Sequence, residues 1–140
     1  MEEKQPVQQK SSKDSVIKAQ NDLLAVIPAQ FAELFNYNTQ MQGLLEGTVE
    51  KFSKAEEYRQ AGYNYKSSII FGLKLLLTNH SPKDLEEIQK IYIEIDYTPF
   101  STLIEASKIG DKIVELTNNA LEYVDDLDEE LKAQEILDTI

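Results

Sequence analysis

Apolar residues follow one another at alternating steps of three and four along the first half of the chain. Nine of the thirteen positions in this series are apolar, a spacing typical of helices that present one continuous apolar seam to a neighbour. Pro28 lacks a backbone donor and disfavours the α conformation at Ile27. We therefore predict a short helix over residues 14–26 and a long helix over 29–61. The series comprises Ile17, Gln20, Leu24, Ile27, Phe31, Leu34, Asn38, Met41, Leu45, Thr48, Phe52, Ala55 and Arg59.

A second, denser apolar run lies between Ser67 and Leu77, after Gly62 and Asn64, whose residue types favour a turn. On a helical wheel most of its large side chains share one arc of about 120°, the width of a core-facing surface. This arc holds Ile69, Ile70, Leu73, Leu76 and Leu77, while Phe71 and Leu75 lie on the far side with Ser68 and Gly72. A helix that is apolar on two sides is either central in its own domain or covered by a partner. The sequence leaves both interpretations open.

A further helix is predicted to begin at Ser81, a favourable N-cap followed by Pro82 and by Asp84 in the first turn. It carries apolar residues at helical spacing. The segment 88–97 also alternates like a β-strand, but no partner strand is evident, so we favour a helix that Pro99 ends. The apolar residues of this face are Leu85, Ile88, Tyr92 and Ile95.

The last seam runs through residues 106–131, and Gly110 and Asp111 could divide it into two helices. Together these elements predict an all-α fold: a helical bundle of about five helices, in which two long coiled-coil-like helices flank a shorter apolar helical hairpin. Residues 1–13 have almost nothing to bury and are expected to form a disordered tail. Residues 14–140 are expected to form a single helical domain. The last seam comprises Ala106, Ile109, Ile113, Leu116, Ala120, Tyr123, Leu127 and Leu131.

The charge of the chain argues against several classes of partner. Its formal net charge is −11, and 25 carboxylates outnumber 14 lysines and arginines. Nucleic acids and anionic membranes require clustered basic residues, so we expect neither as a direct partner. The count over residues 101–140 is three basic and eleven acidic residues, a net −8, and this acidic end would suit a basic protein partner.

Residue types also restrict the chemistry. The chain contains no cysteine and one histidine, His80, which excludes disulfides, thiolate sites and sites that need two imidazoles. Phosphate-loop, nucleophile-elbow and zinc-protease motifs do not occur, and the acidic run 125–130 lacks the glycine of a calcium loop. We predict no catalytic site, metal or cofactor. Without a signal-peptide pattern or a bilayer-length apolar run, we expect an intracellular, cytoplasmic protein, with a nuclear location also open.

The resulting hypothesis is a small acidic helical subunit or adaptor that assembles with other helical proteins, or with itself, through its long helices. One alternative is a bundle enzyme or ligand carrier with a pocket lined by Tyr58, Tyr63, Tyr65, Tyr92 and Tyr97 near Arg59. Another is an acidic inhibitor of a basic protein. The residues predicted to bind a partner are Phe31, Leu34, Met41, Leu45, Phe52, Ser68, Phe71, Gly72, Leu75, Leu116, Tyr123 and Leu127.

Overall fold

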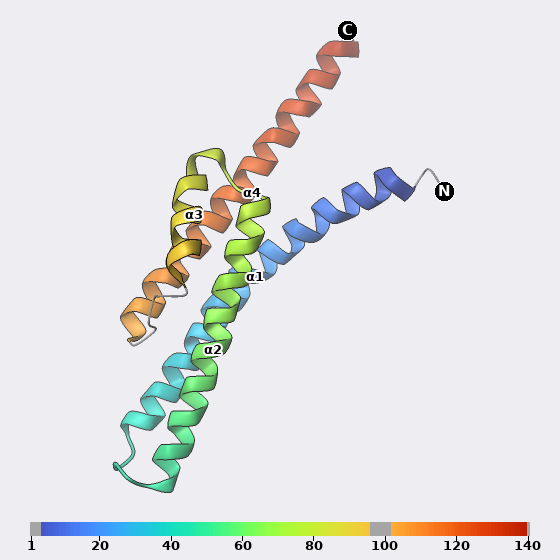
Figure 1. Cartoon of the computed structure of the whole chain (residues 1–140). Helices are drawn as coiled ribbons and strands as arrows, with labels where there is room; N and C mark the ends of the chain where they lie inside the picture. Colours follow the sequence, from blue (N-terminus) through green and yellow to red (C-terminus); the bar gives the residue numbers. More distant parts are fainter. Residues whose placement is uncertain (1–3, 96–101, 140) are drawn as a thin grey trace.

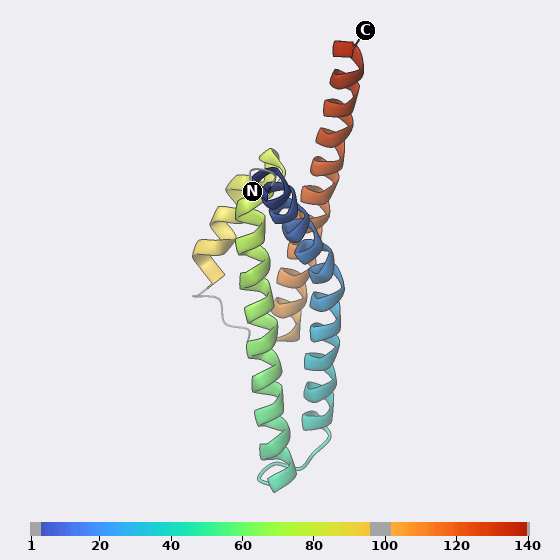
Figure 2. The ribbon, with the colours of Figure 1, turned by 90° about the vertical axis from the view of Figure 1, so that its right-hand side faces the viewer.

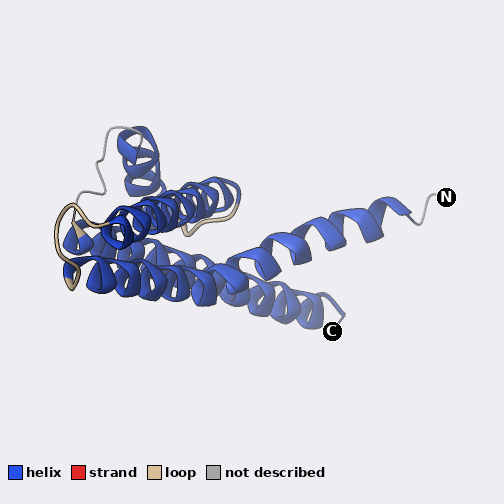
Figure 3. Cartoon of the chain, turned by 90° about the horizontal axis from the view of Figure 1, so that it is seen from below, coloured by secondary structure: helices blue, strands red, loops and turns tan. Residues whose placement is uncertain are grey.

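The chain folds into a bundle of α-helices, as a computed structural model shows for residues 4–95 and 102–139 (Figure 1). No strand occurs in these ranges (Figure 3), so the predicted all-α class is confirmed. The predicted number of five helices is wrong, because the described residues form four α-helices and one short 3-10 turn. The elements are α1 (Lys4–Gln42), α2 (Val49–Thr78), η1 (Pro82–Asp84), α3 (Leu85–Glu94) and α4 (Leu103–Thr139).

The long helices α1 and α2 form an antiparallel hairpin. Helix α4 packs against both, and the short α3 lies beside the C-terminal half of α2 (Figures 1 and 2). The last turns of α4 extend beyond the ends of α2 and α3 (Figure 1). The predicted arrangement, with two coiled-coil-like helices flanking a separate apolar hairpin, is not observed, because the apolar run 67–77 is the second half of α2 itself.

Helix α1 continues through Pro28, so the predicted break at this position is wrong. Proline removes one backbone hydrogen bond from a helix interior and crowds the preceding turn. Its ring is exposed, whereas Leu23, Ile27 and Leu34 are buried on either side of it. Burial of each such side chain contributes about 1.5–3 kcal/mol. Together the three contributions offset the free-energy cost of a proline inside the helix.

The hairpin turn lies at residues 43–48, so the predicted helix over 29–61 and the predicted turn at Gly62 and Asn64 are wrong. Gly47 has a φ of 80°, a conformation that glycine adopts without steric cost. Thr48 then caps α2, since its Oγ1 accepts a hydrogen bond from the Lys51 N–H at 3.1 Å. Gly62 and Asn64 are instead interior residues of α2.

The segment from Leu85 to Glu94 is helical, which decides against the strand interpretation for these residues. Tyr97 and Pro99 lie outside the described residues. Gly110 is an interior residue of α4 and does not divide it. The division into a tail (1–13) and one domain (14–140) stays a prediction: α1 begins at Lys4, but the side chains of residues 4–13 are not among those described.

The core is the set of apolar side chains that the three long helices and α3 bury between them. Two partly buried hydrogen bonds between one pair of residues fasten one end of it. Gln20, fully buried on α1, donates from Nε2 to the Asn79 carbonyl and accepts from Asn79 Nδ2, both at 3.0 Å. The pair therefore holds α1 to the C-terminal end of α2. The largest fully buried apolar side chains are Tyr65, Ile69, Leu73, Leu76, Ile88, Ile113 and Leu116.

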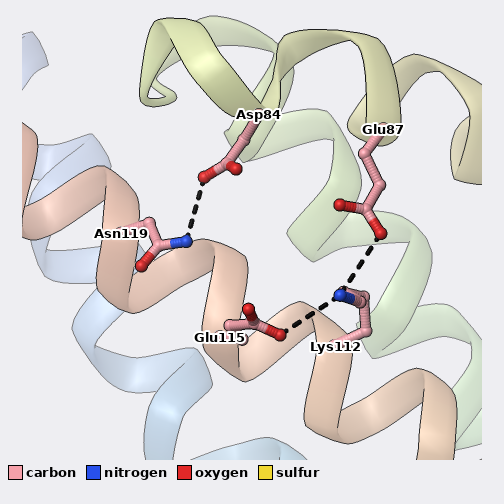
Figure 4. Close-up of polar contacts among 5 residues, drawn as sticks. All are labelled: Asp84, Glu87, Lys112, Glu115 and Asn119. Carbon is pink, nitrogen blue, oxygen red and sulfur yellow. Dashed lines mark hydrogen bonds and ion pairs between the residues drawn. The ribbon is translucent and has the colours of Figure 1, made fainter.

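Polar contacts attach η1 and α3 to α4 (Figure 4). Asn119 Nδ2 donates to Asp84 Oδ2 at 3.0 Å, and Lys112 Nζ lies 3.3 Å from Glu87 and 3.2 Å from Glu115. Hydrogen bonds to the two carboxylates raise the pKa of Lys112. These contacts orient the short α3, whose own buried contribution is small, against the much longer α4.

Candidate interaction surfaces

The described residues show neither a metal site nor a membrane span. They contain no group of three or more His, Asp or Glu side chains that could hold a metal ion. Among the described helices, none has the length and apolar character needed to cross a bilayer. His80 is half-buried just after the end of α2, and its Nδ1 lies 2.9 Å from the Leu76 carbonyl oxygen.

The tyrosines of the predicted pocket do not converge on one cavity in the part of the chain that the structure describes. Tyr65 is buried, whereas Tyr63 and Tyr92 are exposed and Tyr58 is half-buried. The space beside Tyr65 is a small cavity of about 130 Å³ between α1, α2 and α4, well below the several hundred Å³ typical of ligand sites. This arrangement gives no support to a tyrosine-lined ligand site.

Tyr65 instead has a packing role at the meeting point of three helices. Its ring lies 6.1 Å from the Phe31 ring at a tilt of 56°, and its hydroxyl donates to the Ala106 carbonyl oxygen. Gly110 leaves the room that this hydroxyl occupies. Burial, the negative charge of Asp111 and a hydrogen bond with the Gly110 backbone act together on the phenol. The first two outweigh the third and raise the pKa of Tyr65 to about 12 from 10.0.

We expect deprotonation of the Tyr65 phenol to lower the stability of the protein in alkaline solution. Because folding raises this pKa, the folded state holds the phenol proton more tightly, and its contribution is complete below pH 10 and lost as the pH rises towards about 12. The loss should be on the order of 2 kcal/mol. Urea unfolding between neutral pH and pH 12 should show a shallower decline in Tyr65→Phe than in the wild type. Identical pH profiles would contradict this expectation.

Several predicted partner-binding residues lie inside the chain's own core. Leu34, Gly72 and Leu116 are buried. A side chain at Gly72 would meet Leu23 and Ile113 at 3.3 and 3.1 Å, and Ser68 donates a 2.7 Å hydrogen bond to Gln30 Oε1. The small residues at 68 and 72 therefore admit α1 and α4 of the same chain.

The remaining predicted residues lie wholly or partly at the surface. Phe31, Met41, Leu75 and Tyr123 are half-buried. Leu45, Phe52, Phe71 and Leu127 are exposed, with 80%, 67%, 50% and 37% of their surface accessible. Among the predicted partner-binding residues, these four therefore keep the largest fraction of their surface accessible to a partner.

Three exposed apolar side chains gather at the turn between α1 and α2, and we call them the tip patch: Leu45, Val49 and Phe52. Their accessible fractions are 80%, 82% and 67%. The turn lies at the end of the hairpin remote from α3 and from the projecting end of α4 (Figure 1). Sequence reasoning missed Val49, because a seam that assumes an unbroken helix through residues 43–48 places it off the apolar face.

A second candidate surface is an open groove between α1 and α2 of about 380 Å³, which we call the hairpin groove. Its lining is mostly apolar or small, with one carboxylate. Phe71 forms part of its wall and is half exposed. The lining residues are Ala19, Asp22, Leu23, Val26, Ser67, Ser68 and Phe71.

Comparison of the chain with protein-family models, with curated proteins and with solved structures finds no match.

Proposed function

We propose that this protein is a small acidic helical subunit or adaptor that assembles with other proteins or with itself. The observation that supports the proposal is the tip patch. Leu45, Val49 and Phe52 are each at least two-thirds exposed, although every side chain of this type gains about 1.5–3 kcal/mol on burial. Scattered single apolar residues at a surface are ordinary, but grouped ones mark interaction sites.

The surroundings of the tip patch favour a protein as the partner. Glu46, Glu50, Lys51 and Lys54 lie beside its apolar side chains in the sequence, so the stretch lacks the excess of basic residues that would attract an anionic lipid surface. An apolar surface on a partner protein would instead cover the three side chains while leaving the carboxylates at a polar rim. The long hairpin would hold the patch well away from α3.

Capture experiments with matched variants test this function. Immobilised wild-type protein and the triple variant Leu45→Ser, Val49→Ser, Phe52→Ser would be exposed to the same cell extract, and bound proteins identified by mass spectrometry. The control is Ile93→Ser, Ile104→Ser, which removes two side chains of comparable exposure, 69% each, from α3 and α4. We expect a specific set of proteins on the wild type and the control that is missing from the triple variant. If all three retain the same proteins, the tip patch is not the binding surface.

A further inference from the structure

The hairpin groove and the tip patch are different surfaces, formed by opposite ends of α2. We propose that the hairpin groove is a self-association surface, in which a second copy of this chain docks and Phe71 of each copy enters the groove of the other. This inference rests on the proposed assembly function and names one of its partners. It does not involve the tip patch.

Among the residues that the structure describes, those lining the groove come from α1 and α2, which leaves its outer side open to a partner. Helix α4 packs elsewhere on the hairpin, where Ile113 lies next to Gly72. The groove holds small side chains, Ala19, Ser67 and Ser68, between larger apolar ones. Its size would accommodate a side chain as large as phenylalanine.

The same face carries both a hollow and a side chain that suits it. Phe71 is part of the groove wall and keeps half of its surface exposed. In a two-fold symmetric dimer the same surface of each copy forms the contact, so the interface contains two grooves and two Phe71 side chains. A second copy therefore covers both Phe71 side chains and fills both grooves in a single contact.

The charges of this face suit a second copy in spite of the net charge of the chain. Residues 60–78 contain two lysines and no carboxylate, and residues 16–30 contain one lysine and one aspartate. The strongly acidic residues 101–140, three basic against eleven acidic, belong largely to α4. The hairpin face therefore lacks the strong negative charge that would make two copies repel each other through residues 101–140.

A carboxylate in the groove lining and a lysine further along α2 would set how the copies meet. Asp22 lines it from α1. Lys74 is exposed one helical turn beyond Phe71 on α2. With α2 of one copy over α1 of the other, each Lys74 would face Asp22 of the second copy. The present partner of Asp22 is Lys18, 3.6 Å away with both side chains exposed, and such a pair is readily exchanged.

Sedimentation equilibrium of the purified full chain over a range of concentrations tests the proposal. We expect a monomer–dimer equilibrium that Phe71→Asp weakens by at least about a hundredfold, because the interface would contain this residue twice and each loss is on the order of tenfold. Circular dichroism melting at low concentration checks that Phe71→Asp remains folded. A mass that stays monomeric at every concentration, or a dimer that Phe71→Asp leaves unchanged, overturns the proposal.

Charge reversal distinguishes a second copy from any other occupant. Asp22→Lys and Lys74→Asp should each weaken the dimer, and the double variant should restore its affinity, because the two reversed charges then attract each other across the contact between copies. Glu33→Lys is a control that changes the net charge as Asp22→Lys does, but away from the groove lining. Failure of the double variant to recover affinity overturns the proposed contact. A monomer that still loses captured proteins when the tip patch is altered refutes self-association while leaving the proposed function in place.

Discussion

Gly110→Ala is expected to destabilise the protein by about 1–3 kcal/mol, although alanine is the better residue for a helix interior. A Cβ atom at position 110 would overlap the hydroxyl oxygen of Tyr65 and lie 3.3 Å from Ile27 Cγ2. Tyr65 is 1% exposed and hydrogen-bonded to the Ala106 carbonyl, so it cannot move without losing that bond or opening the core. Urea unfolding followed by circular dichroism measures the loss.

Two further variants show whether the clash is the cause. Tyr65→Phe removes the overlapping hydroxyl, so the double variant should recover about 1 kcal/mol or more beyond the sum of the single effects. Gly62→Ala is the matched control, since it is also interior to a helix and its Cβ would meet only Leu34 Cδ1, at 3.9 Å. It should stabilise the protein by about 0.5–1 kcal/mol. Equal effects of the two glycine substitutions would contradict the account.

The helical class was predictable because apolar spacing reflects local geometry, whereas the position of the turn depended on competing local preferences. Gly43 and Gly47 lie on either side of a stretch whose spacing continued the seam, and the periodicity concealed the turn. Gly62 and Asn64 have residue types that favour turns, yet both lie inside α2, next to Ala61 and Tyr65, whose side chains are buried. Burial of the neighbouring side chains therefore outweighed the turn preference of Gly62 and Asn64.

The candidate surface was only partly predictable for a related reason. A helical wheel placed Phe71 opposite the core face, and the structure leaves it half exposed. The same wheel assigned Gly72 to that outer face, but it is buried against Leu23 and Ile113. Leu34 and Leu116 likewise occupy seam positions that α2, α4 and α1 cover within the chain. A seam identifies what must be buried; it does not identify which helix buries it.

Leu73→Ala should cost about 2–5 kcal/mol of unfolding free energy, the largest effect that we expect from one substitution on α2. Leu73 is fully buried between the long helices, and shortening it removes contacts and leaves a void. Phe71→Ala, two residues away on the half-exposed side, should cost about 1 kcal/mol or less in dilute solution. Chemical denaturation of both variants at the same low concentration makes the comparison.

The two losses should respond differently to protein concentration, and this separates the two faces of α2. A core contact acts within one chain, so the cost of Leu73→Ala should be the same at every concentration. A second copy that binds only the folded state adds stability by mass action, so the cost of Phe71→Ala should grow as the wild type dimerises. If Phe71→Ala costs the same at low and high concentration, Phe71 acts only within its own chain. If Leu73→Ala costs no more than Phe71→Ala, the assignment of Leu73 to the core is wrong.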